Sequence, residues 1–150
     1  MPQSLSNILV HFVFSTKNRE PFIRPEIESE LHPYIATIFK ANESPALTIN
    51  GTADHVHILC VLSRKISVAA LIEDVKTNSS SWIKTRGDAY ADFYWQKGYG
   101  SFSIGQSNVA ALKTYIAAQK THHRKISFQD EYRAFLKKYE IDFDERYVWQ

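Results

Sequence analysis

Cysteine, long hydrophobic runs and net charge are all scarce in this chain of 150 residues. The single cysteine, Cys60, excludes a disulfide framework and is typical of a small buried hydrophobic residue. No N-terminal apolar stretch resembles a signal peptide and no run reaches membrane-spanning length, so we expect a cytoplasmic protein without membrane contacts. A formal net charge of +2 is too small to indicate a nucleic-acid partner, so that argument depends on where the charges lie.

The remaining composition is ordinary for one globular domain spanning residues 1–150, with 44% hydrophobic and 13% aromatic residues. The apolar patterns predict four strands, over residues 8–15, 46–53, 55–62 and 93–104. Helical spacing predicts three helices before the C-terminal stretch, over residues 25–39, 67–87 and 107–123. Pro33 predicts either a kink in the first helix or its division into two pieces. The turn between the second and third strands is unresolved, and a hairpin beginning at Asn50-Gly51 is one alternative.

This order of elements predicts an α+β fold of the ferredoxin-like type, also called RRM-like. An antiparallel sheet would carry helices on one face, with an additional C-terminal helix, and the open face could hold side chains that bind a ligand. The same topology underlies RNA-recognition modules, so the fold alone does not distinguish an enzyme from a binding protein. An RNA-recognition module would display stacking aromatic residues on its central strands, whereas this chain displays His55 and His57 there.

The predicted strand 55–62 carries a pair of histidines on one side. Residues i and i+2 of a strand project from the same face, so His55 and His57 point the same way. The other face carries an unbroken apolar row of Val56, Ile58, Cys60 and Leu62 that would anchor the strand in a core. Taken alone, the pair is either a hydrogen-bonded or surface pair or part of a metal site that needs a third ligand.

The predicted helix 107–123, with Ser107 as its N-cap, supplies a candidate for that ligand. Tyr115 and Gln119 are four residues apart and so share one face of the helix, beside its apolar stripe. The simpler alternative is that Tyr115 is an aromatic residue at the edge of the core and Gln119 a solvated neighbour.

These residues carry a resemblance to a known family. Asp54-His55-Val56-His57-Ile58-Leu59, followed by Tyr115-Ile116-Ala117-Ala118-Gln119-Lys120, resembles the small single-tyrosine transposases of the HUH nuclease superfamily. Those enzymes belong to minimal insertion sequences that move as single-stranded DNA. The resemblance extends from the first predicted strand through the tyrosine helix.

The resemblance implies a metal-dependent tyrosine transposase in which His55, His57 and Gln119 bind Mg²⁺ or Mn²⁺ and Tyr115 attacks DNA. Tyr115 would become linked to a 5′ phosphate, and a 3′ hydroxyl would later rejoin strands without ATP. The implied partners are single-stranded DNA with a subterminal hairpin and a second copy of the chain in a homodimer. Loss of the Tyr115 proton during attack requires a nearby cation or base, for which Lys120 and His122 are candidates because they are close in sequence.

Several cationic side chains could follow a DNA backbone, although most surface lysines and arginines are only solvated. The candidates are Lys17, Arg19, Arg64, Lys97, Lys120, His122, His123, Arg124 and Lys125. The last five adjoin the expected nucleophile. Trp95 and Tyr99 could stack on unpaired bases or pack in the core.

The C-terminal stretch 127–150 begins with a capped helix that has a strongly apolar side. That side either packs on the core of this chain or contacts a second subunit. Two other functions are consistent with the sequence: a domesticated DNA-hairpin-binding protein that does not cleave, and a related single-strand nickase. The intact residues His55, His57, Tyr115 and Gln119 argue against the first, and the shortness of the chain against the second.

Overall fold

Four antiparallel strands form one sheet in the order β2-β3-β1-β4 in this computed structural model, which describes residues 2–150. The strands are β1 (Leu9–Ser15), β2 (Ala46–Gly51), β3 (His55–Val61) and β4 (Gly100–Ile104). The helices are α1 (Pro25–Ala41), α2 (Val68–Lys84), α3 (Val109–Ala117), α4 (Gln119–His122) and α5 (Phe128–Lys138). This arrangement confirms the predicted ferredoxin-like α+β fold. In the described part of the chain, no helix has both the length and the apolar character needed to cross a bilayer.

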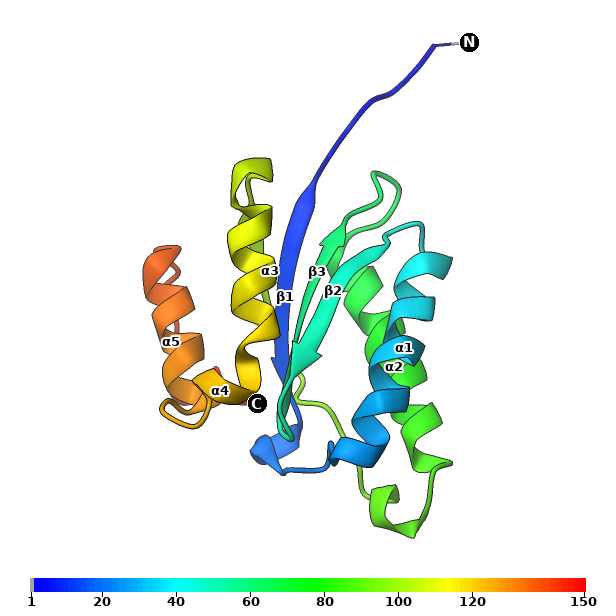
Figure 1. Cartoon of the computed structure of the whole chain (residues 1–150), viewed down its shortest axis with the longest axis vertical. Helices are drawn as coiled ribbons and strands as arrows, with labels where there is room; N and C mark the ends of the chain where they lie inside the picture. Colours follow the sequence, from blue (N-terminus) through cyan, green and yellow to red (C-terminus); the bar gives the residue numbers. More distant parts are fainter. Residues whose placement is uncertain (1) are drawn as a thin grey trace.

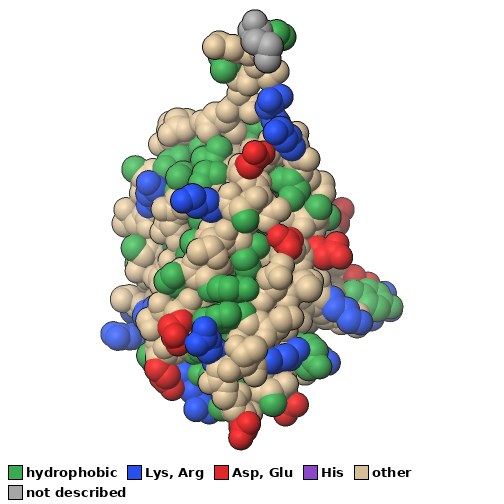
Figure 2. Space-filling model, turned by 90° about the vertical axis from the view of Figure 1, so that its right-hand side faces the viewer, with side chains coloured by type: hydrophobic (Ala, Val, Ile, Leu, Met, Phe, Trp, Pro, Cys, Tyr) green, Lys and Arg blue, Asp and Glu red, His purple; other side chains and the backbone are tan. Residues whose placement is uncertain are grey.

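Helices cover both faces of the sheet, with α1 and α2 on one face and α3, α4 and α5 on the other (Figure 1). Phe12, Phe14 and Ile58 point toward α1 and α2 and form the main hydrophobic core with them. The outer surface on that side mixes acidic, basic and hydrophobic side chains without a dominant sign of charge (Figure 2).

The opposite face of the sheet contains the histidines and two smaller cores. Val13 and Phe102 pack against α5, whereas Leu9 and Leu59 pack against α3. The expectation of an open sheet face is therefore wrong for this chain, because the apolar sides of α3 and α5 pack against that face. For α5, packing within the chain is observed.

Pro33 does not divide the first helix, which is continuous from Pro25 to Ala41, so the second of the two alternatives, a division into two pieces, is wrong. Pro33 and Ser29, whose carbonyl loses its usual partner, both lie on the exposed face where water can solvate that carbonyl. On the buried face, Ile27, Leu31, Ile35, Ile38 and Phe39 hold the helix against the core.

The hairpin between β2 and β3 turns through residues 52–54, which resolves the boundary that the sequence left open. Gly51 lies opposite Val56 at the end of this ladder, and the Thr52 N–H donates to the His55 carbonyl at 3.1 Å. The turn therefore leads directly into the first histidine.

Only the last five residues of the predicted strand 93–104 form β4. Trp95 is buried in the main core and donates its indole N–H to Ser79 Oγ at 2.9 Å, so it is not available to stack on DNA bases. Tyr99 is partly buried against the same core. Burial of these aromatic residues takes the segment before Gly100 out of regular strand pairing, apart from one bridge between Trp95 and Thr16.

Candidate active site

The two β3 histidines are fully buried, and the Nδ1 atom of each lies within hydrogen-bond distance of neighbouring side chains. His55 Nδ1 lies 2.7 Å from Asp54 Oδ1 and 2.9 Å from Thr52 Oγ1. His57 Nδ1 lies 2.8 Å from Nε2 of His11, a β1 residue that the sequence analysis did not single out. Partners of this kind fix the orientation of an imidazole and leave its Nε2 atom facing inward.

Tyr115 and Gln119 lie on two helices rather than one. The predicted helix 107–123 begins instead at Val109, after a 3-10 turn that includes Ser107, and it is interrupted at Ala118. Both side chains nevertheless point to the histidines. Gln119 Oε1 is 3.0 Å from His55 Nε2, and the centroid of the Tyr115 ring is 5.9 Å from that of His57.

The centre of the site is occupied by Glu131, a residue of α5 that the sequence analysis did not identify. Its side chain is 2% exposed. Its Oε1 atom accepts a hydrogen bond from His57 Nε2 at 2.8 Å, and its Oε2 atom accepts one from Gln119 Nε2 at 3.1 Å. The Tyr115 hydroxyl also donates to Glu131 Oε2. Glu131 thus joins the candidate nucleophile to the candidate metal ligands.

These contacts govern the charge of the carboxyl group and of the phenol. Burial acts to raise the pKa of Glu131, but contacts with His123, His57 and Tyr115 outweigh it and hold that pKa well below its usual range. Glu131 also lies in the first turn of α5, where the helix dipole favours an anion. Burial and the hydrogen bond to Glu131 raise the pKa of Tyr115, so its hydroxyl keeps its proton in this state.

His57 and His11, which are buried on the two central strands, are neutral. Burial lowers the pKa of His57 to about 4, although the contact with Glu131 acts in the opposite direction. Burial, followed by the neighbouring His57, lowers the pKa of His11 to about 3. A neutral imidazole can offer a nitrogen lone pair to a metal ion.

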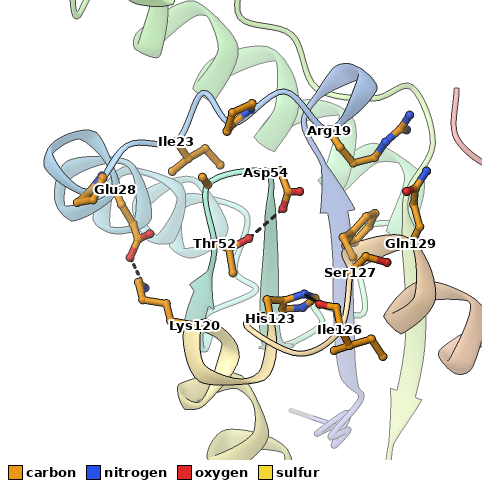
Figure 3. Close-up of a pocket in the computed structure, with 14 residues that line it drawn as sticks. Arg19, Ile23, Glu28, Thr52, Asp54, Lys120, His123, Ile126, Ser127 and Gln129 are labelled. Atoms are coloured by element: carbon orange, nitrogen blue, oxygen red, sulfur yellow. Dashed lines mark hydrogen bonds and ion pairs between the residues drawn. The ribbon is translucent and has the colours of Figure 1, made fainter.

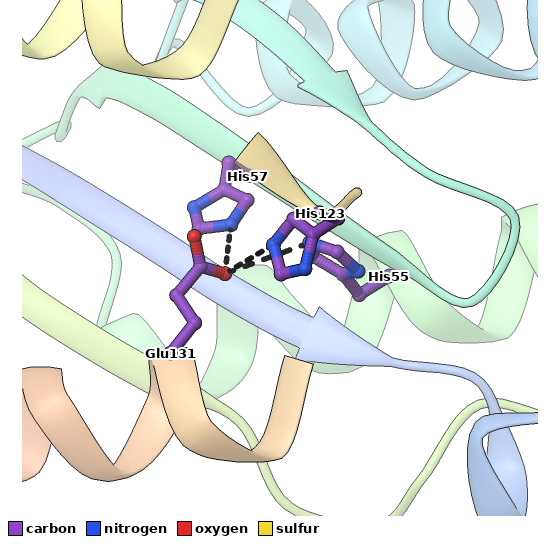
Figure 4. A group of neighbouring side chains, drawn as sticks. All are labelled: His55, His57, His123 and Glu131. Carbon is purple, nitrogen blue, oxygen red and sulfur yellow. Dashed lines mark hydrogen bonds and ion pairs between the residues drawn. The ribbon is translucent and has the colours of Figure 1, made fainter. Parts of the chain in front are cut away.

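The donor set fits a divalent metal ion. Because the Asp54 carboxylate can only accept, it holds the proton of a neutral His55 on Nδ1. The His55 Nε2 lone pair then faces the Gln119 amide oxygen at 3.0 Å. Both atoms are acceptors, and a cation between them would satisfy both. One donor atom each from His55, His57, His123 and Glu131 lie within 4.8 Å of one another (Figure 4).

Three of the expected DNA-binding residues, Arg19, Lys120 and His123, line one cavity of about 460 Å³ (Figure 3). Within it, Lys120 donates to Glu28 Oε1 at 2.7 Å. Arg19 donates to the Trp149 carbonyl oxygen at 3.0 Å, so the C-terminal tail already engages it.

The other expected DNA-binding residues do not share that cavity. His122 lies beside the Tyr115 hydroxyl, at 3.5 Å, and Arg124 and Lys125 are exposed next to it in sequence. Exposed Arg64 belongs to the loop between β3 and α2, at the opposite end of the sheet from α4 (Figure 1). The two remaining candidates, Lys17 and Lys97, are also exposed.

A second cavity, of about 710 Å³, opens on the other side of the histidine cluster between α3 and α5. Its lining includes His11, Tyr115, His122 and Glu131. The Tyr115 side chain is therefore accessible from this cavity.

Comparisons with known proteins identify the family of this chain. The sequence model of the family described as "Transposase IS200 like" matches residues 4–119, and the chain belongs to this family of single-tyrosine transposases in the HUH superfamily. A search of curated proteins finds no significant match to this chain.

Two solved structures share the fold at low sequence identity. One is a candidate transposase of Deinococcus radiodurans R1, with a TM-score of 0.62 and 16% identity over 79% of this chain and 98% of that one. The other is a REP-associated tyrosine transposase bound to a REP hairpin, with a TM-score of 0.62 and 12% identity over 84% of this chain and 74% of that one.

Two features of the sequence could have indicated the missed residues. Glu131 interrupts the apolar stripe of α5, since it lies three residues after Phe128 and four before Phe135. An acidic residue in such a stripe is buried only when it has partners. His11 alternates with the apolar residues Leu9 and Val13 on the same face of β1.

Proposed function

We propose that this IS200-like transposase cleaves and rejoins single-stranded DNA through a covalent bond between Tyr115 and a 5′ phosphate. The observation that carries the proposal is the position of the Tyr115 hydroxyl, which contacts the same Glu131 carboxylate as His57 and Gln119. A nucleophile and a ligand set for a cation therefore share one partner.

In the proposed step, the Tyr115 oxygen forms a bond to phosphorus and the bond between phosphorus and the 3′ oxygen breaks. The phenol loses its proton and the 3′ oxygen leaves as a hydroxyl, so the charges balance. Because one phosphodiester replaces another, the reaction is reversible and needs no ATP. A later attack by a 3′ hydroxyl on the phosphotyrosine joins two strands and releases Tyr115.

His55, His57 and Gln119 would hold Mg²⁺ or Mn²⁺ in this proposal. The bound ion would act as a Lewis acid and stabilise the negative charge that develops on the phosphoryl group. Asp54 and His11 keep the two imidazoles in position through their Nδ1 atoms. The Glu131 carboxylate holds the Tyr115 proton by a hydrogen bond until the site is engaged.

The proposed substrate is single-stranded DNA with a subterminal hairpin. The family supports this, as does the fold shared with a transposase bound to a REP hairpin. The residues lining the cavity of Figure 3 are candidates to contact the DNA backbone, with Lys120 released from Glu28 as DNA binds.

We also propose a homodimer, as in related enzymes. Tyr115 already lies beside His57 within one chain, so the site does not need a partner to bring these two residues together. Light scattering of the chain, alone and with a hairpin oligonucleotide, measures its oligomeric state.

The test of the reaction is incubation with Mn²⁺ and a pool of hairpin-bearing single-stranded oligonucleotides, followed by a denaturing gel. A covalent protein–DNA adduct is expected with the natural chain and with Tyr34→Phe, a control on α1, and not with Tyr115→Phe. An adduct that persists in Tyr115→Phe assigns the nucleophile elsewhere. Hairpin binding without an adduct in any of the proteins refutes the cleavage proposal and favours a hairpin-binding protein.

A further inference from the structure

The segment after α3 brings to the site two more side chains of types that can bind a metal ion, His123 and Glu131. Both lie beyond residue 119, where the match to the transposase family ends. His123 Nε2 is 3.0 Å from Glu131 Oε1, and that oxygen lies 3.6 Å from His55 Nε2 and 2.8 Å from His57 Nε2. One carboxylate oxygen is thus surrounded by three imidazole nitrogens, two from β3 and one from the segment after α4.

His123 is oriented as a metal ligand would be. Its Nδ1 atom lies 2.8 Å from the Ile126 carbonyl oxygen, which can only accept, so Nδ1 carries the proton. When the ring is neutral, its Nε2 lone pair therefore faces the cluster. Its side chain is 8% exposed, and Nε2 has no partner with hydrogen-bond geometry among residues 2–150. A buried acceptor without a donor is costly unless something else satisfies it.

The spacing of the donor atoms agrees with one shared ion. Two nitrogen or oxygen ligands at roughly 2.1 Å from a metal ion are at most about 4.2 Å apart. The donor atoms of His55, His57, His123 and Glu131 lie within 4.8 Å of one another, so shifts of a few tenths of an ångström bring them to one centre.

We infer that His123 and Glu131 are additional metal ligands that, with His55 and His57, bind one divalent transition-metal ion in the DNA-free protein. This inference rests on the proposed function, because it extends the same metal site. Three imidazoles favour Mn²⁺ over Mg²⁺, which prefers oxygen ligands. His57 can join the set as the other neutral tautomer, in which Nδ1 carries the proton and donates to His11 Nε2 while the Nε2 lone pair of His57 is free for the ion.

Calorimetric titration of the full chain, stripped of metal and without DNA, tests the inference with Mn²⁺ and separately with Mg²⁺. We expect His123→Ala and Glu131→Gln each to weaken Mn²⁺ binding at least about tenfold, since changes to outer-shell partners alone cost that much. His123→Ala should also reduce the preference for Mn²⁺ over Mg²⁺. The matched controls are His32→Ala on α1 and Asp130→Asn, the exposed neighbour of Glu131, and both should bind Mn²⁺ as the natural chain does.

A third variant, His57→Ala, separates the two proposals. If it abolishes Mn²⁺ binding while His123→Ala and Glu131→Gln bind normally, the inference is overturned and the proposed site of His55, His57 and Gln119 stands. If the natural chain binds no Mn²⁺, both proposals fail.

A spectroscopic measurement avoids dependence on the folding of any variant. Pulsed electron paramagnetic resonance of Mn²⁺ bound to the natural chain counts the coordinating imidazole nitrogens. Three such nitrogens are expected from His55, His57 and His123, and two would exclude His123.

Discussion

Gly51→Ala is expected to damage both the stability of the fold and the metal site, because this glycine touches the backbone of the first histidine. A Cβ atom at residue 51 would lie 2.1 Å from the His55 carbonyl oxygen and 2.9 Å from Val56 Cα. Real Cβ contacts essentially never fall below 3.0 Å, so the His55 carbonyl must move by about 0.9 Å. Neither atom belongs to a flexible side chain, and the strand itself has to shift.

The structure gives the size of the effect. The His55 carbonyl accepts a hydrogen bond from the Thr52 N–H at 3.1 Å, and losing such a bond costs about 1 kcal/mol. Overpacking in a fitted interior costs about 1–3 kcal/mol more. We therefore expect Gly51→Ala to lower the free energy of unfolding by about 2–4 kcal/mol. A ligand must stay within about 0.5 Å of its place, so Mn²⁺ affinity should fall about tenfold or more.

Urea unfolding followed by tryptophan fluorescence measures the stability, and calorimetry measures Mn²⁺ affinity. The control is Gly105→Ala, whose Cβ would meet only Asn108 Nδ2, at 4.0 Å, and which should change stability by less than about 0.5 kcal/mol. A Gly51→Ala protein with the unfolding midpoint of the natural chain would refute the reasoning, because the hairpin would then tolerate the extra atom without strain.

Two further changes test the support of the site and the core behind it. Asp54→Asn keeps the shape of the partner at His55 Nδ1 but removes its charge. Calorimetry should therefore show Mn²⁺ binding about tenfold weaker. Unchanged affinity would mean that the 2.7 Å contact between Asp54 and His55 does not position the ligand. Phe39→Ala removes a fully buried ring that packs on Phe12. Urea unfolding should show that the free energy of unfolding falls by about 3–5 kcal/mol. The control is Leu47→Ala, a half-exposed residue, which should change it little. A loss below about 1 kcal/mol at Phe39 would show that the core collapses into the space.

The spacing of apolar residues predicted the strands and helices well wherever a single period, that of a strand or that of a helix, dominates the segment. The strand around His55 and the helix beginning at Pro25 follow their apolar periods closely, and the order of elements led to the correct sheet. The segment before Gly100 was the exception. Its aromatic residues resemble a strand, but Trp95 finds a better place in the core and a partner in Ser79, so tertiary packing overrides the local preference.

The residues of the candidate site likewise include some whose placement follows from local pattern and some whose placement does not. His55 and His57 share a face because a strand alternates, and that relation is local. Tyr115 and Gln119 were expected on one continuous helix, yet they reach the same carboxylate across a break at Ala118. Tyr115 and Gln119 stay close together across the break, because the Tyr115 ring packs beside His57 and the Gln119 amide contacts His55.

The sequence by itself determined the order of strands and helices, the shared face of His55 and His57 on their strand, and the resemblance that led to Tyr115 and Gln119. Only the tertiary structure decided that α5 covers the histidine face and brings Glu131 into contact with His57, 74 residues away along the chain. The physical reason is that local periodicity specifies which side of an element is apolar, but not which surface buries it. A single carboxylate or imidazole acquires its role from partners that only the packed chain brings within reach, as His123 does beside Glu131.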